Sequence, residues 1–395
     1  MRDWPSVSAR GELFTYADAA AQVRAALPPS YGVTQAPNGP IDVRDERQKL
    51  VCRIQLRVLT GGSQWLTLAP LRGYERKCDR IRCWLEHGGV HPSWQWKQAR
   101  VPMAADDPAN VAVARVLERL LEIQQANLPG VLAGEDPEFL HDLRVANRRA
   151  RTVVRQMDAA FAPADAARIA AELRWLGAQT GPTRDLEVLL ATLDPVTAEL
   201  EPLRLLLERR LVHARAEMTV SLRSQRATQL DSTLTRLVQE AAQRAPAAIG
   251  VAELAGARIR RLHRRMVRAG GAISAQIEPQ VYHELRKQGK ELRYLLELFG
   301  LALFDNTAVG ELIAALKERQ DVLGRHQDCA VHAATLRQLA PQLAAQPGGV
   351  GALLATGSVI AGLEARQAEA REHFESSFNI FASARQRKLV ARVFD

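Results

Sequence analysis

The sequence predicts a mainly α-helical protein, in which a long helical region with an internal duplication follows a small α+β segment. Apolar residues recur every three or four positions from near Pro108 to the end of the chain, which is the helical period. Proline and glycine residues stand at the joints between these stretches, as helix starts and stops require. A cationic motif occurs twice in the same order, which indicates the duplication. Long helices with short connections predict antiparallel bundles.

The predicted helical region covers residues 107–395 and divides into a first bundle at 107–245 and a second bundle at 250–395. The stretch from Ala245 to Gly250 is the expected hinge between them, because it contains both proline and glycine. In the first bundle we expect helices at 108–127, 136–161, 163–178, 184–192 and 196–227. In the second bundle we expect helices at 251–272, 278–304, 306–324, 326–341 and 350–384, followed by a basic tail helix.

Residues 1–100 are expected to form the small α+β segment. A short helix is possible from Ala17 to Leu27. From Val51 to Val58 apolar and polar residues alternate, and Gly61-Gly62 then turns the chain before a second alternating run at 65–69, which predicts a β-hairpin. A helix from Arg76 to His87 should follow the hairpin.

The first cationic motif is a row of five side chains on one face of the predicted helix at 136–161. At 100° per residue the row falls within an arc of about 80°, and Leu143, Ala146 and Ala150 lie on the opposite, apolar face. Like charges four residues apart destabilise a helix, so a helix selected for stability alone would interleave glutamates. Taken alone, the row is most simply a solvated polar face. Its members are His141, Arg144, Arg148, Arg151 and Arg155.

The second motif repeats the spacing of the first, with His283, Arg286, Lys290 and Arg293 at offsets 0, 3, 7 and 10. Each motif is followed some forty residues later by a glycine-containing break that ends in Arg or His before Asp. The breaks are Leu176-Gly177 to Arg184-Asp185, and Leu323-Gly324-Arg325-His326-Gln327-Asp328. The cationic motif and the glycine-containing break occur twice, in the same order and at nearly the same separation, so an internal duplication is the best explanation.

These paired motifs resemble the CHAD domain, the conserved histidine α-helical domain, over roughly residues 107–395. The resemblance implies two pseudo-symmetric four-helix bundles whose facing basic surfaces bind inorganic polyphosphate. Members of the family occur on polyphosphate granules, often behind a CYTH (triphosphate tunnel) domain. The resemblance therefore implies a non-enzymatic polyphosphate-binding protein that is recruited to granules.

The run Pro70-Leu71-Arg72-Gly73-Tyr74-Glu75 ahead of a helix resembles the end of a CYTH domain. The E-x-E-x-K opening of that family is absent, however, and a hundred residues are too few for its eight-stranded tunnel. We therefore interpret residues 1–100 as a possible truncated CYTH-like remnant. Triphosphatase chemistry needs paired acids that hold a divalent metal ion, and we find none; Glu75 and Glu86 are interpreted as surface acids. No catalytic residue, metal or cofactor is expected.

The composition favours a polyanion as the partner. The net charge is +9 and the pI is near 9.8, which should draw the chain to nucleic acid, anionic membranes or phosphate polymers. Aromatic residues make up only 5% of the chain, whereas a single-strand nucleic-acid binder needs stacking platforms. The four cysteines show no C-x-x-C spacing and are expected to be reduced. With neither a signal peptide nor a membrane span evident, we expect a cytoplasmic protein.

Polyphosphate binding needs a line of cations, and arginine suits it because its planar fork donates bidentate hydrogen bonds to phosphate oxygens. Steps of three and four residues place successive groups about 5 Å apart along a helix. A third row with this spacing lies in the helix expected at 251–272. That row consists of Arg258, Arg261, Arg265 and Arg268. The second-rank candidates are Arg149, Lys287, Arg184, Arg325, His326, Arg204, Arg210 and Arg215.

Several alternatives stay open at this point. His141 and His283 either cap a helix or pack in the core, or they lie in the phosphate-binding groove and are protonated when the polyanion binds. The second role predicts that polyphosphate binds more tightly as the pH falls through the range in which imidazole is protonated. Asp185 and Asp328 either cap a following helix or orient the neighbouring cation. A zinc site from His326, Asp328, Cys329 and His332 matches no familiar spacing. The alternative functions are a nucleic-acid backbone binder and a metal-dependent triphosphatase or polyphosphatase that uses the N-terminal piece.

Overall fold

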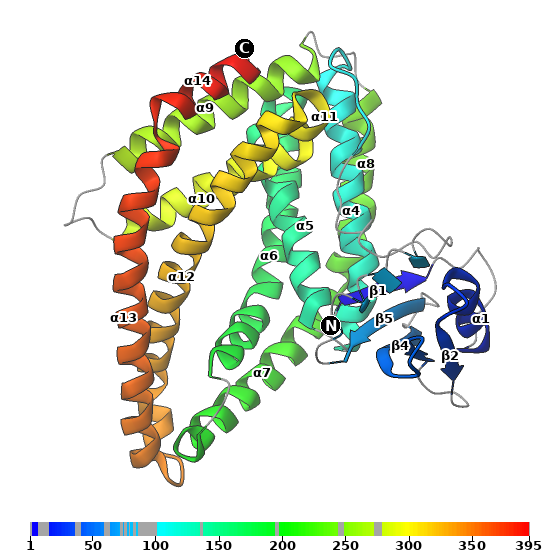
Figure 1. Ribbon diagram of the computed structural model, residues 1–395. Coiled ribbons are helices and arrows are strands. Elements are labelled where there is room, and N and C mark those ends of the chain that lie inside the picture. The colour runs from blue at the N-terminus through cyan, green and yellow to red at the C-terminus, as the bar shows by residue number, and fades with distance from the viewer. Residues whose placement is uncertain are drawn as a thin grey trace. The chain divides into compact units, whose positions relative to one another are not determined.

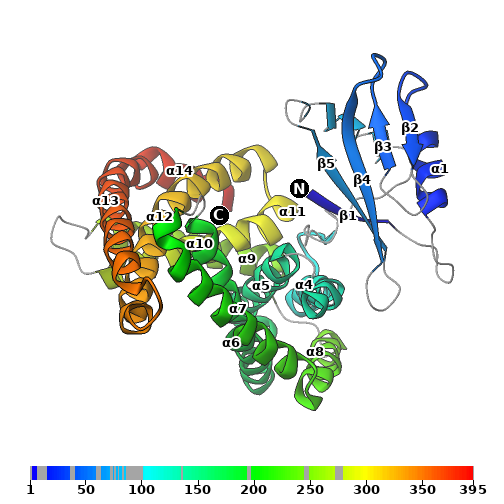
Figure 2. The ribbon, with the colours of Figure 1, turned by 90° about the horizontal axis from the view of Figure 1, so that it is seen from below.

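The structure is a computed structural model, and it describes residues 2–6, 16–35, 41–58, 64–71, 74, 77–78, 80–81, 84–85, 101–134, 137–193, 197–243, 249–271 and 279–394. The chain forms two compact units (Figures 1 and 2). The first unit comprises Met1–Ala99 and Gln125–Asp142, and the second comprises Arg100–Gln124 and Leu143–Asp395. The prediction of a mainly helical protein with a small N-terminal α+β segment is confirmed.

The first unit contains a five-stranded antiparallel sheet in the order β1-β5-β4-β3-β2. The hairpin prediction is confirmed, because β4 and β5 pair from Val58↔Gln64 to Cys52↔Pro70. The other strands lie in the stretch where no strand was predicted. The strands are β1 (Arg2–Ser6), β2 (Gly32–Gln35), β3 (Ile41–Arg44), β4 (Leu50–Val58) and β5 (Gln64–Pro70).

Two helical segments accompany the sheet. The possible helix at 17–27 is α1 (Tyr16–Ala26), and Figure 2 shows it beside β2. Of the helix expected at 76–87, the described residues Lys77, Cys78 and Ile81 are helical, whereas Glu75, Cys83 and Glu86 lie outside the described residues. The relation of this unit to a truncated CYTH domain stays a prediction.

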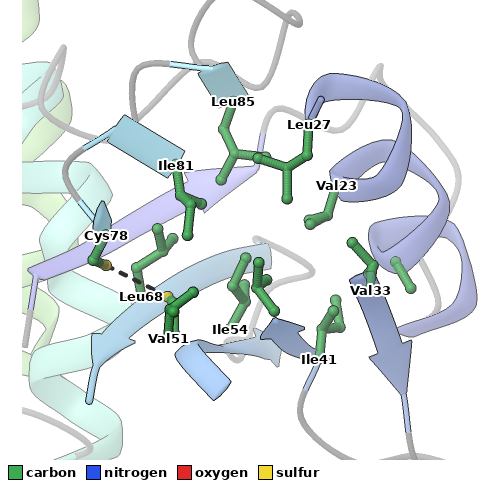
Figure 3. Close-up of a cluster of buried hydrophobic side chains, with 13 residues drawn as sticks. Val23, Leu27, Val33, Ile41, Val51, Ile54, Leu68, Cys78, Ile81 and Leu85 are labelled. Carbon is green, nitrogen blue, oxygen red and sulfur yellow. Dashed lines mark hydrogen bonds between the residues drawn. The ribbon is translucent and has the colours of Figure 1, made fainter. Parts of the chain in front are cut away.

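The core of the first unit forms where the apolar faces of these elements meet (Figure 3). Val51 and Ile54 of β4 are fully buried, as are Val23 of α1 and Ile81. The amphipathic period of each segment thus gives the sheet one covered apolar face.

Helices make up most of the rest of the described chain. They are α4 (Ala109–Ala133), α5 (Pro137–Gln156), α6 (Pro163–Thr192), α7 (Glu201–Leu222), α8 (Gln225–Gln243), α9 (Val251–Gly271), α10 (Pro279–Leu295), α11 (Leu301–Leu303), α12 (Asn306–Ala344), α13 (Gly349–Phe381) and α14 (Ala384–Phe394). Short 3₁₀ turns lie at Asp158–Ala160 and Ala198–Leu200, and a π-turn at Leu296–Gly300. No helix among the described residues is both long and apolar enough to cross a membrane.

The two glycine-containing breaks predicted from the sequence are wrong. Both stretches lie inside uninterrupted helices, the first within α6 and the second within α12. Pro182 sits inside α6, where a proline costs about 3 kcal/mol, but burial of Leu173, Leu176 and Leu189 along one face offsets this cost. Continuous apolar packing therefore prevails over the local helix-breaking signal.

One apolar core in the second unit combines residues from both predicted halves. Leu203 and Leu207 of α7 pack in the same cluster as Leu336 and Leu339 of α12, and all four are at most 1% exposed. Helices α12 and α13 pack against each other along their lengths (Figure 1). The division of the helical region into two equivalent four-helix bundles stays a prediction.

Candidate polyanion-binding site

Parts of the cationic rows of α5 and α10 line one cavity in the second unit, whereas Arg144, Arg286 and Arg293 are not in its lining. The cavity has a volume of about 590 Å³, and Arg148 of α5 and Lys290 of α10 both line it. Arg174 of α6 adds a cation that the sequence analysis missed, because it is a lone basic residue on a helix face of mixed character. The remaining charged residues in the lining are Arg151, Arg155, Lys287, Asp158 and Glu291. The rows thus face a common cavity that holds six cations and two acids.

Two carboxylates, Glu291 of α10 and Glu297 of the π-turn that follows it, pair with arginines of α5. Glu297 accepts a hydrogen bond from Arg149 at 2.7 Å and pairs with Arg293 at 3.3 Å. Glu291, whose side chain is only 10% exposed, pairs with Arg155 and accepts from Gln156 at 2.8 Å. The contacts of Arg149 and Gln156 join residues that are more than 130 positions apart in the sequence. The facing helices are therefore crosslinked by ion pairs, not merely adjacent.

Arg144 of the α5 row is fixed by the stretch of α6 that was expected to be a break. Its guanidinium donates to the Gly177 carbonyl and to Thr180 Oγ1, both at 3.1 Å. A Cβ on Gly177 would lie 3.1 Å from Asn147 Nδ2, which itself donates to the Leu173 carbonyl. The absence of a side chain at Gly177 therefore allows α5 and α6 to approach each other closely, and Gly177 does not form a turn.

The two aspartates at the ends of these stretches act on the rows through their charge. Asp328 of α12 accepts a hydrogen bond from Arg286 at 3.1 Å, and the charge of Asp185 acts on Arg144, the equivalent position of the first row. The capping interpretation is wrong, because both aspartates lie in helix interiors. The orienting interpretation stays a prediction, and Arg184 pairs with Glu187 at 3.2 Å. Each aspartate acts on a row residue from another helix.

Lys290 has the most perturbed charge in the cavity. Burial is the main cause that lowers its pKa to about 7, and the nearby positive charges of Arg286, Arg148 and Arg293 add to it, while Asp328 opposes them. Burial also lowers the pKa of Arg151, with further effects from Arg174 and Arg148. An added polyanion would relieve this mutual repulsion, so the cavity is electrostatically prepared for negative charge.

The third row, on α9, lies beside this cavity, although none of its residues belongs to the lining. Arg258 donates to Asp158 at 2.5 Å, and Asp158 lines the cavity. The charge of Arg265 contributes to the lowered pKa of Arg155. Arg261 and Arg268 are exposed. Three rows predicted separately from the sequence therefore converge in space.

The second-rank candidates separate into different environments. His326 does not join the rows, because it is 5% exposed and stacks on Tyr282 with 4.8 Å between ring centroids. Arg204 pairs with Glu201 and Glu208 on its own helix, and Arg210 donates to Gln342. The others are placed as follows: Arg215 pairs with Glu187, Lys287 pairs with Glu284 beside the cavity, and Arg325 lines a second cavity.

The histidines that open the first two rows are both partly buried. His141 belongs to the first unit, and His283 lies on α10 at the head of the second row. Across the described residues, no group of three or more His, Cys, Asp or Glu side chains is placed to hold a metal ion, and this includes the four residues considered for zinc.

The second cavity, of about 390 Å³, lies between α6, α12 and α13. It combines Arg325 with Arg366 and His373 of α13, two residues that the sequence analysis did not select because they follow no row spacing. His332 and Thr192 also line it, and their side chains are 3.3 Å apart. Asp328 belongs to this lining and pairs with Arg286, so the second cavity adjoins the α10 row.

The fold and this site define a helical module with a strongly basic internal cavity. The family model of the CHAD domain matches residues 115–337, more than half of the chain. The chain therefore belongs to the CHAD-domain family, and the family resemblance inferred from the paired motifs is confirmed.

One of the solved structures that resemble this chain is itself a CHAD domain. The CHAD domain from the plant Ricinus communis is 28% identical, with a TM-score of 0.61 over 71% of this chain and 94% of that one. PptA from Streptomyces chartreusis, at 20% identity and a TM-score of 0.50 over 69% of this chain and 100% of that one, shows the fold alone. The uncharacterized proteins MT2285 and Rv2226 of Mycobacterium tuberculosis, from strains CDC 1551 / Oshkosh and ATCC 25618 / H37Rv, are each 29% identical over 72% of this chain. The chain spans about half the length of these curated relatives (52%).

Proposed function

We propose that this protein binds inorganic polyphosphate, without catalysis, along the three cationic rows, and that binding recruits it to polyphosphate granules. The single observation that carries the proposal is the common cavity in which Arg148 of one row lies near Lys290 of the other. Two rows on one face of separate helices become one site only when they face each other. A flexible chain of phosphates can then be gripped from several sides by charge-assisted hydrogen bonds.

The lining of the cavity favours a polyanion without bases. Tyr294 is the aromatic residue in the lining, and its ring is already flanked by Arg149 and Arg293, each 5.6 Å from the centroid. A nucleic-acid strand gains much of its affinity from stacking on free aromatic faces. The two carboxylates in the lining, Asp158 and Glu291, are paired with arginines, which supports a binding role over a catalytic one.

The proposal is tested by removing two exposed cations of the cavity lining, Arg151 of α5 and Lys287 of α10, as Arg151→Ala with Lys287→Ala. We expect the affinity for long-chain polyphosphate to fall about 100-fold, because each lost charge-assisted contact is worth about 1.5 kcal/mol. The measurement is calorimetric titration at two salt concentrations, and the salt dependence should weaken together with the affinity. The matched control is Arg223→Ala with Lys317→Ala, which removes the same charge from exposed positions away from the cavity.

Two further measurements separate this function from its alternatives. In competition, polyphosphate should displace labelled RNA at far lower concentration than RNA displaces polyphosphate; the reverse order would favour a nucleic-acid binder. Phosphate release from triphosphate or polyphosphate with Mg²⁺ or Mn²⁺, measured on the full chain, should stay at the background rate. Equal affinities of the row variant and the parent would contradict the proposed site.

A further inference from the structure

The Lys290 side chain ends in an accessible amine without a partner, in the cavity of about 590 Å³. Lys290 is partly exposed, so a small molecule in the cavity can reach its amine. The amine makes no hydrogen bond and no ion pair within the part of the chain that the structure describes. The other lysine of the lining, Lys287, is more exposed but pairs with Glu284 at 3.2 Å. The two lysines of one cavity therefore differ in what their amines are free to do.

Three guanidinium groups of the same lining also lack a carboxylate partner among the described residues. They belong to Arg148, Arg151 and Arg174. The charge of Arg148 acts on both Lys290 and Arg151, and the charge of Arg174 acts on Arg151, so these groups lie near one another. The Nε atom of Arg148 is buried and donates to no acceptor among the described residues. Guanidinium groups bind phosphate oxygens strongly, so a phosphate bound by these arginines would lie close to the Lys290 amine.

The protonation state of Lys290 fits this arrangement. Its amine lies among Arg286 and Arg293 of its own helix, Arg148 of α5 and Asp328 of α12. Burial is the main cause that lowers its pKa to about 7, the three arginines lower the pKa further, and the aspartate opposes them. An amine attacks a carbon atom with its lone pair, which protonation removes. Near neutral pH a large share of Lys290 is therefore nucleophilic, whereas a lysine with an ordinary pKa of about 10.4 is almost entirely protonated.

We propose that Lys290 is a covalent modification site, at which small acyl phosphates acylate the amine while the arginines of the cavity hold their phosphate group. In this reaction the lone pair of Nζ forms a bond to the acyl carbon, and the bond from that carbon to the phosphate oxygen breaks. Inorganic phosphate leaves with the electron pair of that bond, and the nitrogen gives one proton to water. The product is a neutral amide.

Acylation would remove one of the six cations of the lining. It should therefore weaken the binding of polyphosphate to the cavity. This consequence rests on the proposed function, whereas the modification itself does not.

The test treats the full chain with acetyl phosphate near pH 7.5 and follows the acetylation of each lysine by peptide mass spectrometry. Lys287 of the same cavity and the exposed Lys317 are internal references. Phenyl acetate, an acetyl donor without phosphate, separates the reactivity of the amine from the recognition of phosphate. The variants are Arg151→Ala and, as a matched control, Arg223→Ala at an exposed position outside the lining.

With acetyl phosphate, we expect the initial rate at Lys290 to exceed the rates at Lys287 and Lys317 by about tenfold or more, because only Lys290 is largely unprotonated. Excess inorganic phosphate should slow the reaction at Lys290 alone. Arg151→Ala should slow the reaction of Lys290 with acetyl phosphate more than its reaction with phenyl acetate, and Arg223→Ala should change neither. Equal rates at the three lysines would overturn the inference. So would a preference for Lys290 that is as large with phenyl acetate and insensitive to inorganic phosphate.

Calorimetric titration with long-chain polyphosphate measures the consequence for binding. We expect the affinity of the acetylated protein to fall about tenfold, because one charge-assisted contact is lost. Lys290→Arg, which keeps the positive charge but has no amine to acylate, should keep its affinity after the same treatment. Selective acetylation of Lys290 in a parent that binds no polyphosphate would overturn the proposed function and leave the modification site standing. Complete acetylation of Lys290 with unchanged polyphosphate affinity would overturn the effect of the modification on binding.

Discussion

Lys290 shows how the surroundings of one residue set the chemistry of the site. It faces Arg286 and Arg293 of its own helix, Arg148 of α5 and Asp328 of α12, and it is partly buried among them. Its pKa of about 7 means that the amine is largely neutral in slightly alkaline solution. Bound polyphosphate would favour the charged form, so ligand binding and proton uptake are coupled at this residue.

The first prediction concerns this proton. At pH 8 the parent should take up about one proton on binding polyphosphate, whereas Lys290→Met should take up fewer. The affinity of the parent should also fall as the pH rises above 7. The measurement is calorimetric titration in two buffers of different ionisation enthalpy. Equal proton uptake by both proteins would contradict the role of Lys290.

The lowered pKa of Lys290 also predicts how the free energy of unfolding changes with pH. The pKa of Lys290 is lower in the folded protein than the ordinary value of 10.5, so the unfolded chain binds more protons between pH 7 and 10.5. The contribution of Lys290 to the free energy of unfolding should therefore rise with pH across this window. Urea unfolding of the parent and of Lys290→Met at pH 7 and pH 9 checks this, and the parent should gain more stability than the variant.

At the scale of the element, α6 and α12 use the same local sequence for different purposes. Both carry a Leu-Gly pair followed by an aspartate that acts on a row of cations. Gly177 of α6 allows close contact with α5, whereas a Cβ on Gly324 of α12 would meet nothing within 4 Å. In the sequence the two glycines occupy equivalent positions. Only the packing shows that Gly177 is required for close helix contact and that Gly324 is not.

This difference predicts opposite effects of the same substitution. Gly324→Ala should stabilise the protein by about 1 kcal/mol, because alanine favours a helix interior over glycine by this amount. Gly177→Ala should gain nothing or destabilise, since its Cβ would press on Asn147 and disturb the hydrogen bond to Leu173. Urea denaturation of both variants measures the difference, and an equal gain in both would show that the close approach is not required.

At the scale of the whole helical unit, two separate kinds of contact hold the predicted halves together. The Arg155–Glu291 ion pair joins them at the cavity, and the leucine core shared by α7 and α12 joins them elsewhere. Leu207 and Leu336 are buried in the same cluster although they come from different halves. The halves should therefore unfold together and not as independent domains.

Leu336→Ala tests this cooperativity. Removing a side chain that is 1% exposed should destabilise the unit by about 3 kcal/mol through lost burial and a residual cavity. The transition should move to lower urea concentration and remain single for this unit, as followed by circular dichroism and by tryptophan fluorescence. Two separate helical transitions, one per half, would contradict a shared core. Val331→Ala on the same helix is the control, since Val331 is 45% exposed.

The sequence by itself determined the helical class, the N-terminal hairpin and the three rows of cations, because helical and strand periods depend on near neighbours and need no tertiary information. The sequence wrongly predicted breaks within α6 and α12. Proline and glycine favour a helix end through local effects, whereas the apolar face that keeps each helix continuous is buried by residues distant in the sequence. Only the tertiary structure decided that the rows face one cavity, that His326 is buried, and that Lys290 lies among like charges. Charge interactions and burial depend on distances across the folded chain, and spacing along the sequence does not fix those distances.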